Sequence, residues 1–151
     1  MRNMLKWVWI CFVGLLGAVQ ISCVSAPAPV PTKPTDYETV LFPKLVSGAF
    51  VGEYSGKPIR LQGSFWAQGP QFLPGGISQD RNIAFGMAGP GGYGVDGSGL
   101  WVDVVVPKEQ SALVFELKPG DGITVIGVAQ KGMRSGRETL YIMAHELRKG
   151  S

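Results

Sequence analysis

A short run of alternating residues constrains the fold of this chain more than any other feature. The segment GLWVDVVVP, residues 99–107, is rich in β-branched residues and stops at a proline. Alternation of apolar and other residues over this length predicts a half-buried antiparallel strand. One face of the strand carries Trp101 and Asp103, and the other carries four apolar residues: Leu100, Val102, Val104 and Val106.

Four other segments are also predicted to be strands, and turn residues separate them. They are SGKPIRLQGSFWAQ (55–68), a weaker strand at 82–87, LKPGDGITVIGVAQ (117–130) and ETLYIMAHEL (138–147). Residues 37–54 fit either a short helix or a loop entering a strand. A brief connector, residues 108–117, lies between the third and fourth strands. About five short strands so arranged predict an all-β domain, built as a small closed antiparallel barrel.

The order of these segments resembles the OB-fold. In that fold a Leu-x-x-Gly-Asp-x-Val-x-Val-x-Gly type segment opens the fourth strand, as LKPGDGITVIG does here, and a hairpin leads to the fifth. The resemblance covers residues 46–147. Gly63 and Gly127 would then face the interior of strands that must coil sharply, where a side chain would obstruct the bend. We therefore expect a five-stranded OB-like barrel.

The first residues of the chain have the layout of a secretory signal. MRNMLK supplies two cations, and the uncharged apolar block WVWICFVGLLGAV follows. Even counted to Ile21, a helix of this block rises roughly 22 Å, which is short of the ~30 Å hydrocarbon core of a bilayer. The block is typical of a signal peptide rather than of a permanent span.

A single cysteine follows this apolar block. Gln20-Ile21-Ser22-Cys23 resembles the lipobox of bacterial lipoproteins, although that family prefers leucine where Gln20 stands. The resemblance implies cleavage before Cys23 and fatty acyl groups, such as palmitate, on this residue. Cys11 would leave with the signal peptide, so the mature chain could form no internal disulfide. Several acyl chains anchor a protein far better than one.

The lipoprotein resemblance also implies a location and three segments. Aspartate after the cysteine retains lipoproteins of this family at the inner membrane, and Val24 stands there instead. We therefore expect an anchor in the outer membrane and a domain facing the periplasm, with the inner membrane or secretion as alternatives. The segments are a signal peptide (1–22), the lipidated cysteine with a proline-rich linker (23–36) and the barrel domain (37–151).

The linker and the charge balance bear on partners. VSAPAPVPTKPTD carries four prolines in thirteen residues and predicts a polyproline-like stalk of roughly 40 Å. The whole chain is nominally +3, but removal of Arg2 and Lys6 leaves 12 basic against 11 acidic residues. This near-neutral mature charge argues against nucleic acid as a partner. Membrane lipid, through the acyl anchor, and another envelope protein or a glycan are the expected ones.

Aromatic residues mark the candidate binding face. OB-folds bind ligands on the face of strands two and three with the flanking loops, and stacking on aromatic rings is a common device. The alternative is that residues 37–50 cover these rings as a lid. The glycine-rich stretch GMAGPGGYGVDGSG (86–99) lacks the lysine and helix of a phosphate loop and predicts a long hairpin loop. The candidate ligand-binding residues are Arg60, Trp66, Tyr93, Trp101 and Asp103.

A second candidate feature is the cationic loop between the last two strands. It brings together Lys131, Arg134 and Arg137, partly offset by Glu138. We expect a solvated hairpin. Contact with phosphate-bearing lipid head groups or a polyanion is the alternative.

Catalytic and metal-binding chemistry have little support in the sequence. His145 is the only histidine, and the domain has no cysteine, so neither a cluster of metal ligands nor a marked catalytic triad is present. We predict a non-catalytic binding or scaffolding module with no metal or cofactor besides its acyl groups. Two alternatives are an envelope hydrolase or transferase centred on His145 and an OB domain that binds single-stranded nucleic acid.

The lipid anchor is directly testable by intact-mass spectrometry of membrane-extracted protein. Wild type should have the mass of a chain that begins at Cys23 and carries acyl groups, because the lipobox directs both steps. Cys23→Ser should lose that mass. An unlipidated wild-type chain that begins elsewhere would contradict the anchor.

Overall fold

The computed structural model describes residues 36–92 and 99–150. Cys23, Tyr93, the signal peptide and nearly all of the linker lie outside the described residues. The strands are β1 (Glu38–Val40), β2 (Pro58–Gln68), β3 (Asn82–Ala88), β4 (Trp101–Pro107), β5 (Gly122–Arg134) and β6 (Arg137–Lys149). The helices are α1 (Phe42–Val46), α2 (Val51–Tyr54) and α3 (Ala112–Glu116), with 3-10 turns η2 (Pro70–Phe72) and η3 (Lys108–Gln110). Among the described residues, no helix has the length and apolarity to cross a membrane.

The strands form one sheet that closes on itself. Their order is β1-β2-β3-β4-β6-β5, and β2 also pairs with β5. The ring therefore consists of β2, β3, β4, β6 and β5, and β1 adds to it as a short parallel strand beside β2. Neighbours in the ring are antiparallel except for β4 and β6, which are parallel. This is the topology of an OB-like barrel and confirms the predicted all-β fold.

The barrel interior contains the apolar faces expected from alternation. Ile59 and Leu61 of β2 and Val104 of β4 are fully buried. Val105 points the other way, yet it is also buried, in a second cluster outside the barrel. A second apolar layer therefore covers part of the outer surface of β4, which strict alternation between core and solvent does not predict.

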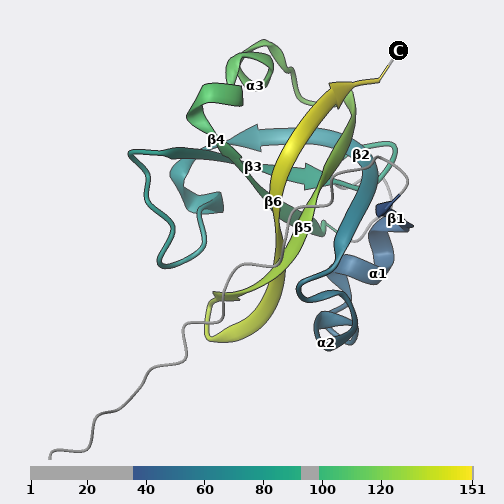
Figure 1. Cartoon of the computed structure of the whole chain (residues 1–151). Coiled ribbons are helices and arrows are strands. Elements are labelled where there is room, and N and C mark those ends of the chain that lie inside the picture. The colour runs from purple at the N-terminus through teal and green to yellow at the C-terminus, as the bar shows by residue number, and fades with distance from the viewer. Residues whose placement is uncertain (1–35, 93–98, 151) are drawn as a thin grey trace, which may run out of the picture.

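Helices close the two ends of the barrel (Figure 1). The connector between β4 and β5 forms η3 and α3 at one end, and residues 38–54 form β1, α1 and α2 at the other. Pro43 stands in the first turn of α1, where its missing N–H is not needed. Phe42 and Leu45 enter the core together, as their i, i+3 spacing favours. The N-terminal segment is thus a plug for the barrel.

Two glycines allow the strands to approach one another. Directly after Gly63, at Ser64, the partner of β2 changes from β5 to β3, and a Cβ at Gly63 would lie 2.8 Å from the Met87 methyl group. At Gly127 the register between β5 and β6 shifts. A Cβ at that glycine would lie 2.9 Å from the Ala144 Cα and closer still to the Met143 carbonyl oxygen. Both glycines therefore have the role that the sequence predicted.

Gly127→Ala should destabilise the fold by about 2 kcal/mol, because the added methyl forces apart the β5 and β6 backbones. Gly52→Ala is the matched control. Gly52 lies in α2, and its Cβ would meet no atom within 4 Å, so this change should be neutral or slightly stabilising. Urea unfolding of both variants measures the difference. An equally small effect at Gly127 would contradict the closure role.

Candidate functional site

Three aromatic rings pack together on the outer surface of β2, β3 and β4. The centroid of Trp66 lies 4.8 Å from that of Trp101 and 5.4 Å from that of Phe72. The register between β2 and β3 shifts at Trp66, and shifts of this kind commonly redirect a side chain. Gly86 of β3 lies beneath the rings, because a Cβ there would be 2.7 Å from Trp66 and 2.8 Å from Phe72.

The segment that follows β2 covers these tryptophans. Phe72 belongs to η2 and is only 2% exposed, and Leu73 and Ile77 pack against the same cluster. The alternative that residues 37–50 cover the tryptophans as a lid is wrong, because these residues pack at the end of the barrel. Trp66 and Trp101 do lie on the outer face and are half-buried. Their role in ligand binding stays a prediction.

Asp103 holds Trp101 and the β5–β6 hairpin to the barrel. Asp103 is only 5% exposed, and its carboxylate accepts a hydrogen bond from the Trp101 indole N–H at 3.1 Å. Arg134, near the end of β5, forms an ion pair with the same carboxylate and lies 4.7 Å from the centroid of the Trp101 ring. Burial lowers the pKa of Arg134 from its usual value, but a guanidinium keeps its charge at neutral pH.

Sequence reasoning did not identify this partnership. It placed Asp103 near Trp101 and treated Arg134 as part of a solvated loop, but Arg134 is half-buried on the barrel. A carboxylate in the middle of an apolar strand needs a buried partner, and this was the signal for a cation from another strand. The identity of that cation depends on the β5–β6 hairpin reaching back over β4.

The other predicted binding residues do not join this face. Arg60 is six residues before Trp66, roughly 20 Å along the strand, and its register partners are Thr39 of β1 and Ile126 of β5. Tyr93 lies outside the described residues. The structure therefore brings together Trp66, Trp101 and Asp103, and it separates Arg60 from them.

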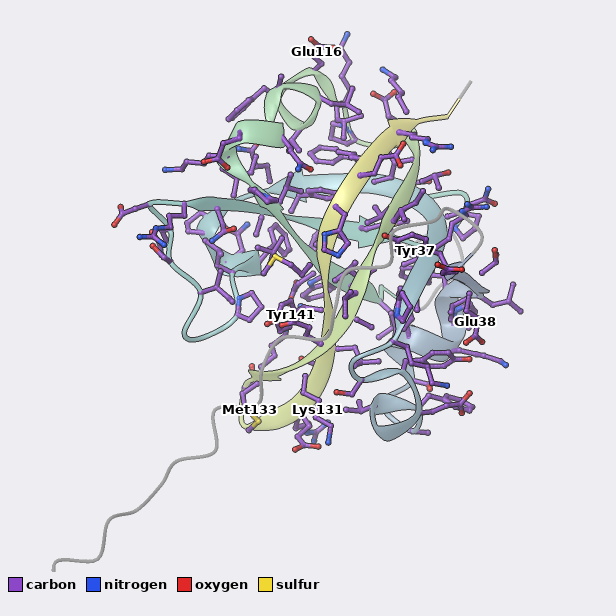
Figure 2. The ribbon with its side chains drawn as sticks, viewed as in Figure 1. Tyr37, Glu38, Glu116, Lys131, Met133 and Tyr141 are labelled. Carbon is purple, nitrogen blue, oxygen red and sulfur yellow. The ribbon has the colours of Figure 1, made fainter. Side chains whose placement is uncertain are left out.

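The remaining hairpin charges have different surroundings. Lys131 lies 3.7 Å from Glu138, and both side chains are about half exposed or more. Figure 2 shows Lys131 and Met133 near the tip of the hairpin, far from Glu116 of α3. Arg137 is exposed and forms no ion pair among the described residues. The solvated hairpin that the sequence predicted is therefore present in part, since Lys131 and Arg137 face solvent.

A cleft of about 340 Å³ lies beside Trp101, at the barrel end that α1 plugs. The pairing of β4 with β6 starts only at Asp103 and Tyr141, and the cleft occupies the place where these strands diverge. Its lining has an apolar floor and a polar rim. The floor is formed by Leu45, Val102 and Leu140, which are buried, and the rim includes Ser47, Arg134, Arg137 and Glu138.

His145 stands apart from the cleft lining. It is half-buried on β6, and its Nε2 is buried without a hydrogen-bond partner among the described residues. Burial lowers its pKa below the usual 6.5, so the neutral imidazole is favoured in the fold. Within the part of the chain that the structure describes, no three His, Cys, Asp or Glu residues are grouped to hold a metal ion.

The chain matches no protein-family model and no curated protein sequence. Among solved structures, a chain of the S. pombe Stn1–Ten1 complex has a TM-score of 0.42 at 18% identity. That match covers 61% of this chain, which spans only 57% of the S. pombe chain. An OBody bound to hen egg-white lysozyme has a TM-score of 0.47 at 15% identity, over 79% of this chain and 94% of its own. A putative aspartyl-tRNA synthetase from Leishmania major Friedlin has a TM-score of 0.45 at 8% identity, and the match covers 82% of this chain and 23% of the synthetase chain. These likenesses concern the fold alone.

A double-mutant cycle on Asp103→Ala and Arg134→Ala should give a coupling free energy of about 2 kcal/mol, because the pair is largely buried and charge-assisted. Chemical denaturation of the two single variants and the double variant measures it. The matched control is the pair Glu146 and Arg148 on β6, whose side chains are 47% and 56% exposed. That pair should show little coupling. Equal coupling in the two cycles would mean that Asp103 does not anchor the hairpin.

Proposed function

We propose that this protein is a lipid-anchored, non-catalytic binding module of the bacterial cell envelope and that it binds its ligand in the cleft beside Trp101. The observation that carries the proposal is the cleft itself. At about 340 Å³ it has the size of a small-molecule site, and an apolar floor with a few polar groups at its rim is the usual composition of such sites.

The walls of the cleft are held in place by the fold. Leu45 fixes α1 through the core, and Arg134 is held by Asp103. A site whose side chains are already positioned loses less entropy when it binds a ligand. The wall formed by Trp101 and Arg134 therefore suits a binding function without a large rearrangement.

The sequence around Cys23 supports the anchored location. A cysteine at the end of a signal peptide, followed by a proline-rich stalk of roughly 40 Å, would hold the barrel away from the membrane surface. The expected site is the periplasmic side of the outer membrane. Proteins and glycans of the envelope, and small molecules within it, are then the available partners.

The packing also favours this role over the two alternatives. A hydrolase centred on His145 would need partners at both ring nitrogens, a nucleophile at one and an orienting group at the other, and Nε2 has no hydrogen-bond partner in the described part of the chain. A single-strand nucleic-acid site would need accessible ring faces, and Phe72 packs against both Trp66 and Trp101. The near-neutral mature charge also argues against nucleic acid.

Photo-crosslinking in cells tests whether the cleft is occupied. The photoreactive residue p-benzoylphenylalanine replaces Leu100, which lines the cleft and is 45% exposed. In a two-membrane bacterium, illumination should yield a discrete adduct on the full-length protein, resolved by intact mass. We expect this adduct because a ligand bound in the cleft would lie within contact distance of the side chain at position 100.

Phe115 provides the matched control. It is 64% exposed and belongs to α3, at the opposite end of the barrel from α1 (Figure 1). The same replacement there should give no such adduct. No adduct at position 100, or the same adducts at both positions, would contradict a ligand site in the cleft.

A further inference from the structure

We infer that the ligand of the cleft is a small anionic amphiphile, with an apolar chain or ring on the floor and a phosphate or carboxylate at Arg137. This inference rests on the proposed function, and it adds the chemical class of the ligand. It combines three features of the cleft: its apolar floor, the ion pairs of its rim and the position of Arg137 beside the β5–β6 turn.

The floor requires an apolar group. Leu45, Val102 and Leu140 are each at most 4% exposed, and they belong to the barrel core. Leu100 and Trp101 add a further wall. A ligand that was polar throughout would lose its hydration against this surface without forming compensating hydrogen bonds. An alkyl chain or an aromatic ring would instead gain from burial.

Three charged residues line the cleft, Arg134, Arg137 and Glu138, and Arg137 is the one without an ion pair among the described residues. Asp103 pairs with Arg134, and Lys131 lies beside Glu138. Arg137 also lines the cleft and forms no ion pair among the described residues. Its guanidinium can donate two parallel hydrogen bonds to a phosphate or carboxylate. The charged end of the ligand is therefore expected to be an anion.

The hairpin turn holds Arg137 at the mouth of the cleft. Ser135 and Gly136 have φ angles of 49° and 76°, as a two-residue turn between antiparallel strands requires. Arg134 and Arg137 are register partners across this turn. Because Asp103 fixes Arg134 on the barrel, it also limits where Arg137 can lie. The anion site is thus built on paired strands.

Calorimetric titration with three probes tests the ligand class. Octyl phosphate, octyl glucoside or inorganic phosphate is titrated into the full-length protein in neutral phosphatidylcholine vesicles. Each amphiphile is kept below its critical micelle concentration. Octyl phosphate should bind at least tenfold more tightly than octyl glucoside, which lacks the anion, or inorganic phosphate, which lacks the chain. Vesicles without protein give the heat of partitioning to be subtracted.

Two arginine variants locate the anion site. Arg137→Gln should weaken the binding of octyl phosphate about tenfold, which corresponds to the loss of one charge-assisted contact at an exposed site. The affinity for octyl glucoside should not change. Arg148→Gln also removes one positive charge, but near the far end of β6 and outside the cleft lining. It should change the affinity for neither probe. Leu100→Glu, which puts a negative charge on the wall of the cleft, should weaken octyl phosphate more than octyl glucoside.

The outcomes separate this inference from the proposed function. If octyl glucoside bound as tightly as octyl phosphate and Arg137→Gln had no effect, the anionic class would be wrong, but a cleft that binds ligands would stand. If no probe bound and Leu100 gave no crosslink, both would be wrong. If the ligand is an anionic amphiphile, adding phosphatidylglycerol to the vesicles distinguishes two sources of that ligand. Competition with octyl phosphate would identify a bilayer lipid, and no competition would identify a soluble amphiphile.

Discussion

Closure of the barrel depends on backbones that approach more closely than a side chain allows. Directly after Gly63 strand β2 changes its partner from β5 to β3, and at Gly127 the β5–β6 pairing shifts its register. A Cβ at either position would overlap a neighbouring strand. Closure brings β4 beside β6, and both the cleft and the ion pair of Asp103 with Arg134 depend on that arrangement.

The outer face of the barrel is covered by the protein's own side chains. Ligands of OB-folds bind over the second and third strands of the barrel, which are β3 and β4 here. Phe72 fills the space over Gly86 of β3. The rings of Trp66 and Trp101 are consequently part of a second apolar cluster. The opening lies instead at the barrel end, where Trp101 forms one wall and the hairpin supplies the charge.

Local sequence was enough for the five strands of the ring and for the two glycines, but not for the short strand β1. Alternation placed Ile59 and Val104 inside, and their burial confirms it. The candidate site was predicted less completely. Trp66, Trp101 and Asp103 are together as expected, but Arg60 lies far along β2. The partner of Asp103 was missed because Arg134 is 31 residues away in sequence, and only closure of the barrel makes them neighbours.

The sequence by itself determined the class of the domain, the turns and the glycine positions, because periodicity and backbone sterics act over a few residues. It also contains the lipobox-like segment at Cys23, a pattern that needs no fold. Only the tertiary structure decided that residues 38–54 plug the barrel, that Phe72 covers the tryptophans and that a cleft opens beside Arg137. These features arise between distant segments, where burial and charge pairing depend on which surfaces the closed sheet brings into contact.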